Sequence, residues 1–346
     1  MEDDHLDKPI SVALAVTESG LEARAKSRAL SALDRLIGNL ADRWNASLES
    51  GTTDIRAKTA ARKKFIEGLG DSGSAILNRD PEFAADAIEM HLGITVNRQI
   101  NKNEVVAAAL EDLRSNPPSS DEATKGDEKL SNTFLDRLGR YAEDATEDQV
   151  RDKWGKVLAA EIRRPGTFSP KVMRVIDELD QSTALLFEKI CQNRLGRGII
   201  KCLAGPLSFS DRAMLVTAGL LVDPGFSGQQ ITSRSVTDDD GKRLFFINFE
   251  LASLGIAQSV ELVKENKGEL LPLIKTDNGV AVPVFVLTDE GLAISSILED
   301  KQEQALSQIL NAIANQIAPA EVLEYRQFDL DKMKIVRRIA KSVAAT

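Results

Sequence analysis

The sequence has few of the residues that build metal sites and disulfide frameworks. It contains only two cysteines and two histidines among 346 residues. Cys191 and Cys202 are too few for the disulfide framework of a small secreted protein, and His5 and His91 lie far apart in the sequence. No cluster has the spacing of zinc ligands. We therefore expect no metal and no cofactor, and the cysteine usage fits a reducing, cytoplasmic location.

Long apolar runs are also missing. The acidic N-terminus continues with Lys8 and Pro9, which is unlike the basic region and apolar stretch of a signal peptide. The longest early apolar run, at residues 10–16, is far shorter than the roughly 18 to 20 residues that a membrane-spanning helix needs. We expect a chain without a membrane span.

Familiar catalytic motifs do not occur either. The sequence has no Gly-x-x-x-x-Gly-Lys-Ser/Thr, no Gly-x-Gly-x-x-Gly turn after a strand and no Gly-x-Ser-x-Gly. The acidic turn at residues 238–241 lacks the later ligands of a calcium loop, so we interpret it as a polar turn. The sequence therefore predicts that the chain is not an enzyme, and it identifies no small-molecule substrate.

What the sequence does contain favours helices. Aromatic residues make up 5% of the chain and charged residues 28%, and alanine, leucine and long charged side chains are abundant. We expect a mainly α fold with a smaller α+β part, in which a helical bundle precedes a winged-helix-like unit with a β-hairpin and C-terminal helices. The predicted segments are an N-terminal helical region (1–115), a flexible linker (116–128), a central helical block (129–195), a winged-helix-like unit (196–300) and C-terminal helices (301–346).

Several helix signals support this division. The apolar residues Leu33, Ile37 and Trp44 fall on one stripe, which predicts a helix packed inside the chain or, as the alternative, a dimeric coiled coil. Pro81 suits the first turn of a further helix. Thr146 and Gln149 have capping-box spacing before the apolar face that carries Trp154.

The later part of the chain shows a change of period. A short helix after residue 208 is expected to end at Gly219, and strands are expected at residues 220–222 and 245–249. Apolar runs at residues 270–275 and 280–287 flank an Asn-Gly turn, which predicts a β-hairpin. Thr288 is expected to cap a helix. Two terminal helices are predicted, at residues 301–317 and 319–345.

Residues 134–189 resemble a known family. The block at 154–169, the Arg-Gln-x-Asn element at 98–101 and later glycine-containing elements are similar to an uncharacterised bacterial family, the domain of unknown function numbered 2806. The motif residues are Trp154, Glu161, Pro165, Gly166 and Ser169. The resemblance implies no established activity. Similar tryptophan blocks in abortive-infection-like proteins imply, by analogy, a role in phage defence.

Glu161 is the acidic residue of this block that is a candidate for acid–base catalysis. An ion pair with Arg163, Arg164 or a neighbouring helix is the simpler interpretation, and the sequence favours it over acid–base chemistry.

Two functions follow as hypotheses. The first is a non-enzymatic interaction or regulatory protein whose winged-helix-like unit binds a protein partner, a second copy of the chain or DNA; the alternative is an antiphage defence effector that acts through assembly or toxicity. The net charge of −9 disfavours polyanion binding by the molecule as a whole. The candidate contact residues are basic: Arg56, Arg62, Lys63, Lys64, Arg212, Lys275, Arg337 and Arg338.

Overall fold

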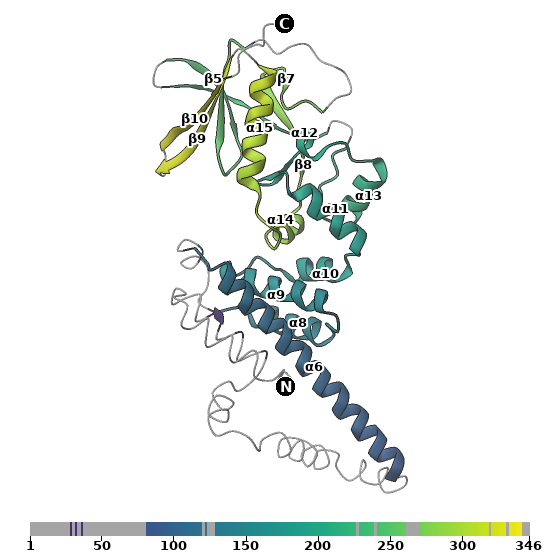
Figure 1. Cartoon of the computed structure of the whole chain (residues 1–346). Coiled ribbons are helices and arrows are strands. Elements are labelled where there is room, and N and C mark those ends of the chain that lie inside the picture. The colour runs from purple at the N-terminus through teal and green to yellow at the C-terminus, as the bar shows by residue number, and fades with distance from the viewer. Residues whose placement is uncertain are drawn as a thin grey trace. The chain divides into compact units, whose positions relative to one another are not determined.

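The computed structural model describes part of the chain, as two compact units (Figure 1). Unit 1 is Met1–Met173 and unit 2 is Arg174–Thr346. The described residues are 81–119, 129–225, 228–238, 241–260, 270–317, 320–329 and 332–340, with Arg28, Ala29, Ala32, Leu36 and Glu122. The predicted basic cluster around residue 62, the apolar stripe through Trp44 and most of the predicted linker lie outside them.

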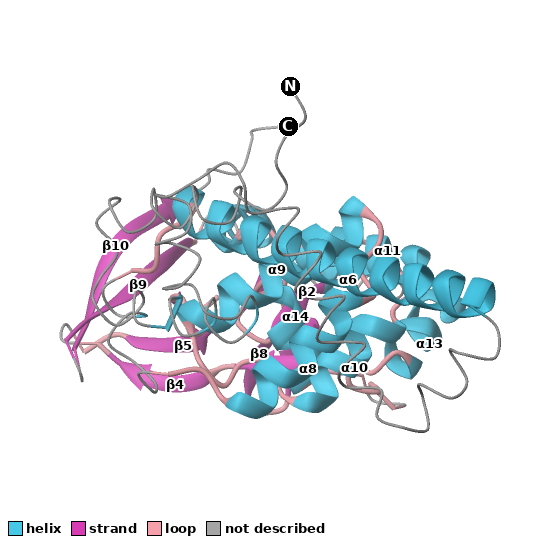
Figure 2. Cartoon of the chain, turned by 90° about the horizontal axis from the view of Figure 1, so that it is seen from below, coloured by secondary structure: helices cyan, strands magenta, loops and turns pink. Residues whose placement is uncertain are grey.

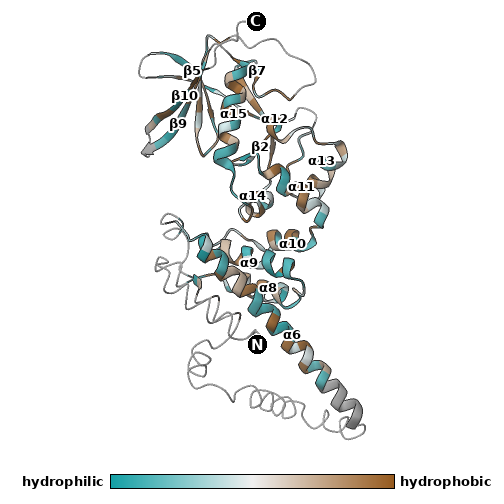
Figure 3. Ribbon diagram, viewed as in Figure 1, coloured by the Kyte–Doolittle hydropathy of each residue, from teal (hydrophilic) through white to brown (hydrophobic). Residues whose placement is uncertain are grey.

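The described part of unit 1 is built from helices that pack against one another. Its described elements are α6 (Pro81–Ser115), α8 (Asn132–Glu143) and α9 (Asp148–Arg163), and α10 (Pro170–Glu178) crosses the boundary between the units. Polar and apolar residues alternate along α6 (Figure 3), and its described buried residues lie between Asn101 and Leu113. The start of α6 at Pro81 confirms the helix predicted there.

The helices α6 and α9 cross closely because Gly155 has no side chain. A Cβ atom at this position would stand 2.6 Å from the Cβ of Ala108 and 3.0 Å from the backbone nitrogen of Ala109. The predicted capping box at the start of α9 is wrong: the N-cap is Glu147, whose side chain makes no capping hydrogen bond. The apolar face predicted for this helix is confirmed, with Trp154 and Leu158 fully buried.

Unit 2 combines two antiparallel sheets with short helices (Figure 2). The first sheet has the order β1-β2-β8-β3, with β7 also paired to β8, and the second has the order β10-β9-β6-β5-β4. The strands of the first sheet are β1 (Arg194–Leu195), β2 (Gly198–Ile200), β3 (Gln230–Thr232), β7 (Ile274–Thr276) and β8 (Gly279–Val286). Those of the second are β4 (Arg234–Thr237), β5 (Arg243–Asn248), β6 (Ser253–Ala257), β9 (Glu321–Asp329) and β10 (Lys332–Ala340).

A large apolar core joins the two sheets of unit 2 to α15, and a smaller cluster contains Leu244, Phe246, Leu323 and Tyr325. The helix α15 (Gln302–Gln316) buries Leu306, Ile309 and Ile313 completely. These side chains belong to one cluster with Val282 of the first sheet and Leu254 of the second. The remaining helices of the unit are α11 (Gln181–Cys191), α12 (Lys201–Ala204), α13 (Phe209–Thr217) and α14 (Asp289–Ser295).

Local signals in this region are confirmed. The Asn-Gly turn joins β7 to β8 in antiparallel register, with Thr276 opposite Gly279. The Thr288 hydroxyl accepts a hydrogen bond from the backbone nitrogen of Gly291 at 2.9 Å and caps α14. The helix α13 ends before Gly219, which has a φ of +74° and so adopts a conformation that glycine favours.

The second terminal helix, predicted at residues 319–345, is wrong: this segment forms the β9–β10 hairpin. Its charged side chains resemble a solvated helix face in sequence, but Glu324 of β9 is buried and pairs with Arg337 across the hairpin. The strand expected at residues 220–222 is reduced to a single bridge between Leu221 and Leu287. The helical N-terminal part and the β-containing C-terminal part fit the expected class, and the winged-helix identity stays a hypothesis.

Candidate functional site

In unit 1, side chains of the family-like segment are buried and join the helices to one another. Trp154 is 1% exposed, and its ring stacks on Tyr141 with centroids 4.5 Å apart. In the Arg-Gln-x-Asn element, the Nδ2 of Asn101 donates to the carbonyl oxygen of Glu143 at 2.8 Å, and its Oδ1 accepts from Arg151 at 2.8 Å. This buried amide therefore ties α6 to the end of α8 and the start of α9.

Glu161 anchors the loop that follows α9. Its two carboxylate oxygens accept hydrogen bonds from the backbone nitrogens of Gly166, at 2.7 Å, and Phe168, at 2.9 Å. The ion pair predicted with Arg163 or Arg164 is wrong, because these arginines pair with Asp112 and Glu122 instead. Burial raises the pKa of Glu161, and the backbone hydrogen bonds oppose this increase.

The other motif residues surround the same loop. Gly166 has a φ of +90°, which suits the tight turn after Pro165. The Ser169 hydroxyl accepts a hydrogen bond from the backbone nitrogen of Val172 at 3.3 Å, at the start of α10. The polar groups of this block thus stabilise the loop after α9 and the start of α10.

Four of the eight basic residues predicted as contacts are described, and they lie on three different elements. Arg56, Arg62, Lys63 and Lys64 lie outside the described residues. Arg212 lies on α13, Lys275 on β7, and Arg337 and Arg338 on β10.

The two arginines of β10 have acidic neighbours. The Nε and Nη2 atoms of Arg337 lie 2.7 Å from the Glu324 carboxylate, and its Nη1 is 3.2 Å from the Ser307 hydroxyl. Arg338 lies 3.7 Å from Glu321. Glu324 is 2% exposed, so Arg337, whose side chain is 38% exposed, is paired with a buried carboxylate.

Arg212 stands in a different environment. Its Nε atom is buried and has no acceptor within the part of the chain that the structure describes. Lys201 lies nearby, with its Nζ 4.9 Å from the centroid of the Phe285 ring. Burial lowers the pKa of Lys201, and the positive charge of Arg212 lowers it further. The two cations make this part of unit 2 locally basic.

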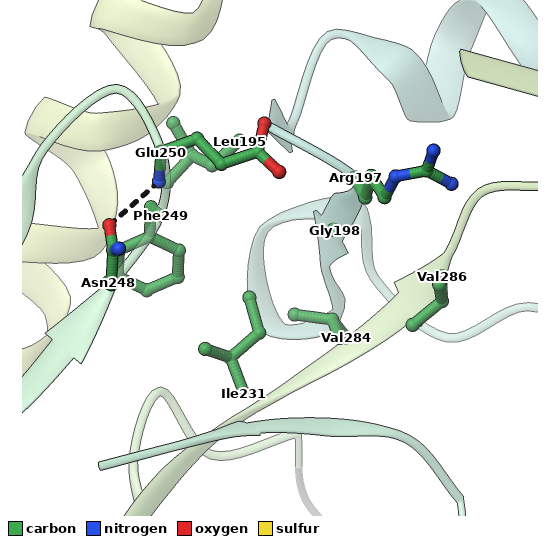
Figure 4. A pocket seen from close by; sticks show the side chains of 9 residues that line it. All are labelled: Leu195, Arg197, Gly198, Ile231, Asn248, Phe249, Glu250, Val284 and Val286. Carbon is green, nitrogen blue, oxygen red and sulfur yellow. Dashed lines mark hydrogen bonds between the residues drawn. The ribbon is translucent and has the colours of Figure 1, made fainter. Parts of the chain in front are cut away.

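Unit 2 also contains a pocket between its two sheets (Figure 4). Its volume is about 200 Å³. Strands β2, β3 and β8 of the first sheet supply one wall, and the turn from β5 to β6 supplies the other. The lining side chains are mainly apolar: Leu195, Ile231, Phe249, Val284 and Val286, with Arg197, Asn248 and Glu250 as the polar ones and Gly198 between them.

Glu250 is placed at this pocket by a strained backbone. Its φ of +64° is the only positive φ of a non-glycine residue in the described part of the chain. Such a conformation costs about 1–3 kcal/mol and is common at functional sites. The Oδ1 of Asn248 supports it by accepting a hydrogen bond from the backbone nitrogen of Glu250 at 3.0 Å. Sequence reasoning missed this residue because nothing local to it signals the conformation.

Two glycines make room for this arrangement. A Cβ at Gly196 would lie 2.8 Å from the Oε2 of Glu250, and one at Gly198 would lie 3.1 Å from Ile231 and 3.2 Å from Val284. Gly198 therefore keeps the floor of the pocket open, and Gly196 leaves space for the carboxylate.

No group of metal-ligating side chains occurs within the described residues. In the same part of the chain, no helix combines the length and apolar character needed to cross a membrane.

These features define a protein with a helical unit and a mixed unit of antiparallel sheets and helices. Residues 91–196, from the middle of α6 to β1, match the model of a family described as protein of unknown function, DUF2806. This match confirms the resemblance over residues 91–196. No curated protein and no solved structure matches the chain.

Proposed function

We propose that the chain is a non-enzymatic interaction protein and that its 196–300 unit binds a protein partner through the exposed face of α13. The element order supports a winged-helix-like unit: α11 is followed by β2, then by α12 and α13, and the β7–β8 ribbon precedes α14. In helix-turn-helix proteins the second helix of the pair makes the contacts.

One observation carries the choice of a protein partner, namely the chemistry of the exposed α13 face. Phe209 is 81% exposed at the start of the helix. The other exposed residues of α13 are Ser210, Ala213 and Thr217, none of which is charged. A DNA-reading helix needs cations for phosphates and donors or acceptors for base edges, whereas exposed aromatic side chains are typical anchors of protein interfaces.

Neither charged residue of α13 is among its exposed residues. Asp211 closes a capping box with Ser208, and Arg212 is only partly exposed. At the tip of the ribbon, Lys275 lies two residues from Asp277, so the ribbon adds no excess positive charge. The lack of excess positive charge on α13 and at the tip of the ribbon favours a protein partner over DNA.

Site-specific photocrosslinking tests the proposal. A benzoylphenylalanine at position 209, in cells that express the chain naturally, is expected to crosslink to a defined protein. The control is a chain with the same group at position 333, where Met333 is an apolar residue of unit 2 that is 42% exposed. Equal crosslinking from the two positions would refute a specific contact at α13.

A binding titration with duplex DNA tests the alternative partner. Binding that weakens about a thousandfold between 50 and 200 mM salt is the mark of extensive phosphate contacts. Such a result would identify DNA as the partner and contradict the proposed protein partner. For the defence role, nothing in the described part of the chain adds an argument beyond the family resemblance.

A further inference from the structure

The pocket of unit 2 combines an apolar interior with a single acidic group. Ile231, Phe249, Val284 and Val286 present alkyl or aromatic surface to its interior (Figure 4). Its volume of about 200 Å³ is below the roughly 300–1,000 Å³ of pockets for drug-sized ligands. The space therefore suits one side chain or one short aliphatic molecule.

Among the described residues, no cationic side chain forms an ion pair with the acidic group at this pocket, Glu250. Arg197, which also lines the pocket, forms its ion pair with Asp289 at 2.7 Å, and Figure 4 shows its guanidinium directed away from the cavity. Arg194 donates a hydrogen bond to the carbonyl oxygen of Gly196 at 3.0 Å. Within the described chain, neither arginine is within ion-pair distance of the Glu250 carboxylate.

The position of Glu250 is specified by residues far apart in the sequence. Asn248 holds its backbone in the left-handed region, and the absence of a side chain at Gly196 leaves room for its carboxylate. Glu250 is an exposed residue, so its carboxylate contacts solvent at the pocket. The arrangement directs one negative charge to the mouth of an apolar cavity.

We propose that this pocket binds a primary aliphatic ammonium group. The alkyl chain lies against Ile231, Val284 and Val286, and the ammonium group lies at the Glu250 carboxylate, next to the Phe249 ring. An aromatic face adds attraction for a cation. The same chemistry is offered by a free alkylamine and by a lysine side chain of a peptide. The pocket is separate from the α13 face, so this proposal does not depend on the proposed function.

Ligand titrations of the full chain at constant ionic strength test the ammonium site. The probes are n-butylamine and lysine blocked at both backbone ends, with n-butanol and ammonium chloride as controls that keep only the alkyl chain or only the charge. Binding is followed by NMR shifts of methyl groups in Ile231 and Val284. Saturable shifts are expected with the two amines and not with the controls. Tighter binding of blocked lysine than of butylamine would identify a peptide as the source, and the reverse would identify a small amine.

Variants separate the charge from the cavity. Glu250→Gln keeps the shape and removes the charge, and it is expected to weaken amine binding about fivefold, the scale of an exposed ion pair. Gly198→Ala places a methyl group 3.1 Å from Ile231 and is expected to weaken binding by filling the floor. Glu299→Gln, at an exposed carboxylate of the same unit that pairs with Lys301, is the control and should bind as the unchanged chain does.

Two outcomes would overturn the proposal. One is the absence of saturable shifts with either amine. The other is equal amine binding by the Glu250→Gln and Glu299→Gln chains. Urea unfolding of each variant shows whether it is folded. If a variant fails to fold, the comparison of the amines with butanol and ammonium chloride on the unchanged chain decides whether the ammonium site exists.

Discussion

The closeness of the α6–α9 crossing predicts that Gly155→Ala destabilises unit 1. The added Cβ would lie 2.6 Å from the Cβ of Ala108 and 3.1 Å from the carbonyl oxygen of Val105. Ordinary carbon contacts are about 3.5–4.0 Å, so the helices must move apart by about 1 Å. Overpacking of this kind costs about 1–3 kcal/mol, while replacing a helical glycine by alanine returns about 1 kcal/mol. A net loss of up to about 2 kcal/mol is expected.

Urea unfolding followed by helical circular dichroism measures this change. The control is Gly93→Ala in α6, where an added Cβ meets no atom within 4 Å. Without a clash, only the gain in helix propensity remains, and the control should be more stable than the unchanged chain by about 0.5–1 kcal/mol. Equal stabilisation by the two substitutions would refute the close crossing.

Three further predictions concern single side chains. Hydrogen bonds from Ser182 and Thr183 lower the pKa of Asp180, which caps α11. The ionised carboxylate therefore stabilises the fold above the unfolded-state pKa near 3.9, and this stabilisation is lost as the pH falls below that value. Asp180→Asn should destabilise the chain more at pH 6 than at pH 3 in urea titrations. Burial raises the pKa of Cys191 to about 12 and that of Cys202 to about 11, so both thiols should react with a disulfide reagent at pH 8 only after unfolding, and fast labelling of the folded chain would contradict this. Replacing Arg212 by Met removes a buried Nε without an acceptor and keeps the alkyl packing, so the free energy of unfolding should stay equal or rise by about 1 kcal/mol; a loss above that size would show a stabilising partner for the guanidinium.

Short-range chemistry was readable from the sequence. The Asn-Gly turn before β8, the Thr288 cap and the end of α13 at Gly219 depend on residues within a few positions of one another. Trp154 was also predicted correctly as a core residue, because its helix has a regular apolar face. These features need no knowledge of distant parts of the chain.

The failures have the opposite character. The β9–β10 hairpin is charged along its length, and Glu324 is buried only because Arg326 and Arg337 bind it. The function of Glu161 as a loop anchor depends on a turn that forms after its helix. Glu250 reaches the pocket because Gly196, far away in the sequence, has no side chain. Nonlocal pairing of this kind has no period or motif from which to predict it.

The most direct test of the proposed function measures how a crosslinked partner binds the chain at different salt concentrations. An apolar contact centred on Phe209 predicts a dissociation constant that changes little between 50 and 500 mM salt and rises at least about tenfold in Phe209→Ser, since burial of a large aromatic side chain contributes about 1.5–3 kcal/mol. Affinity that falls steeply with salt and is unchanged by Phe209→Ser would contradict an interaction through the α13 face.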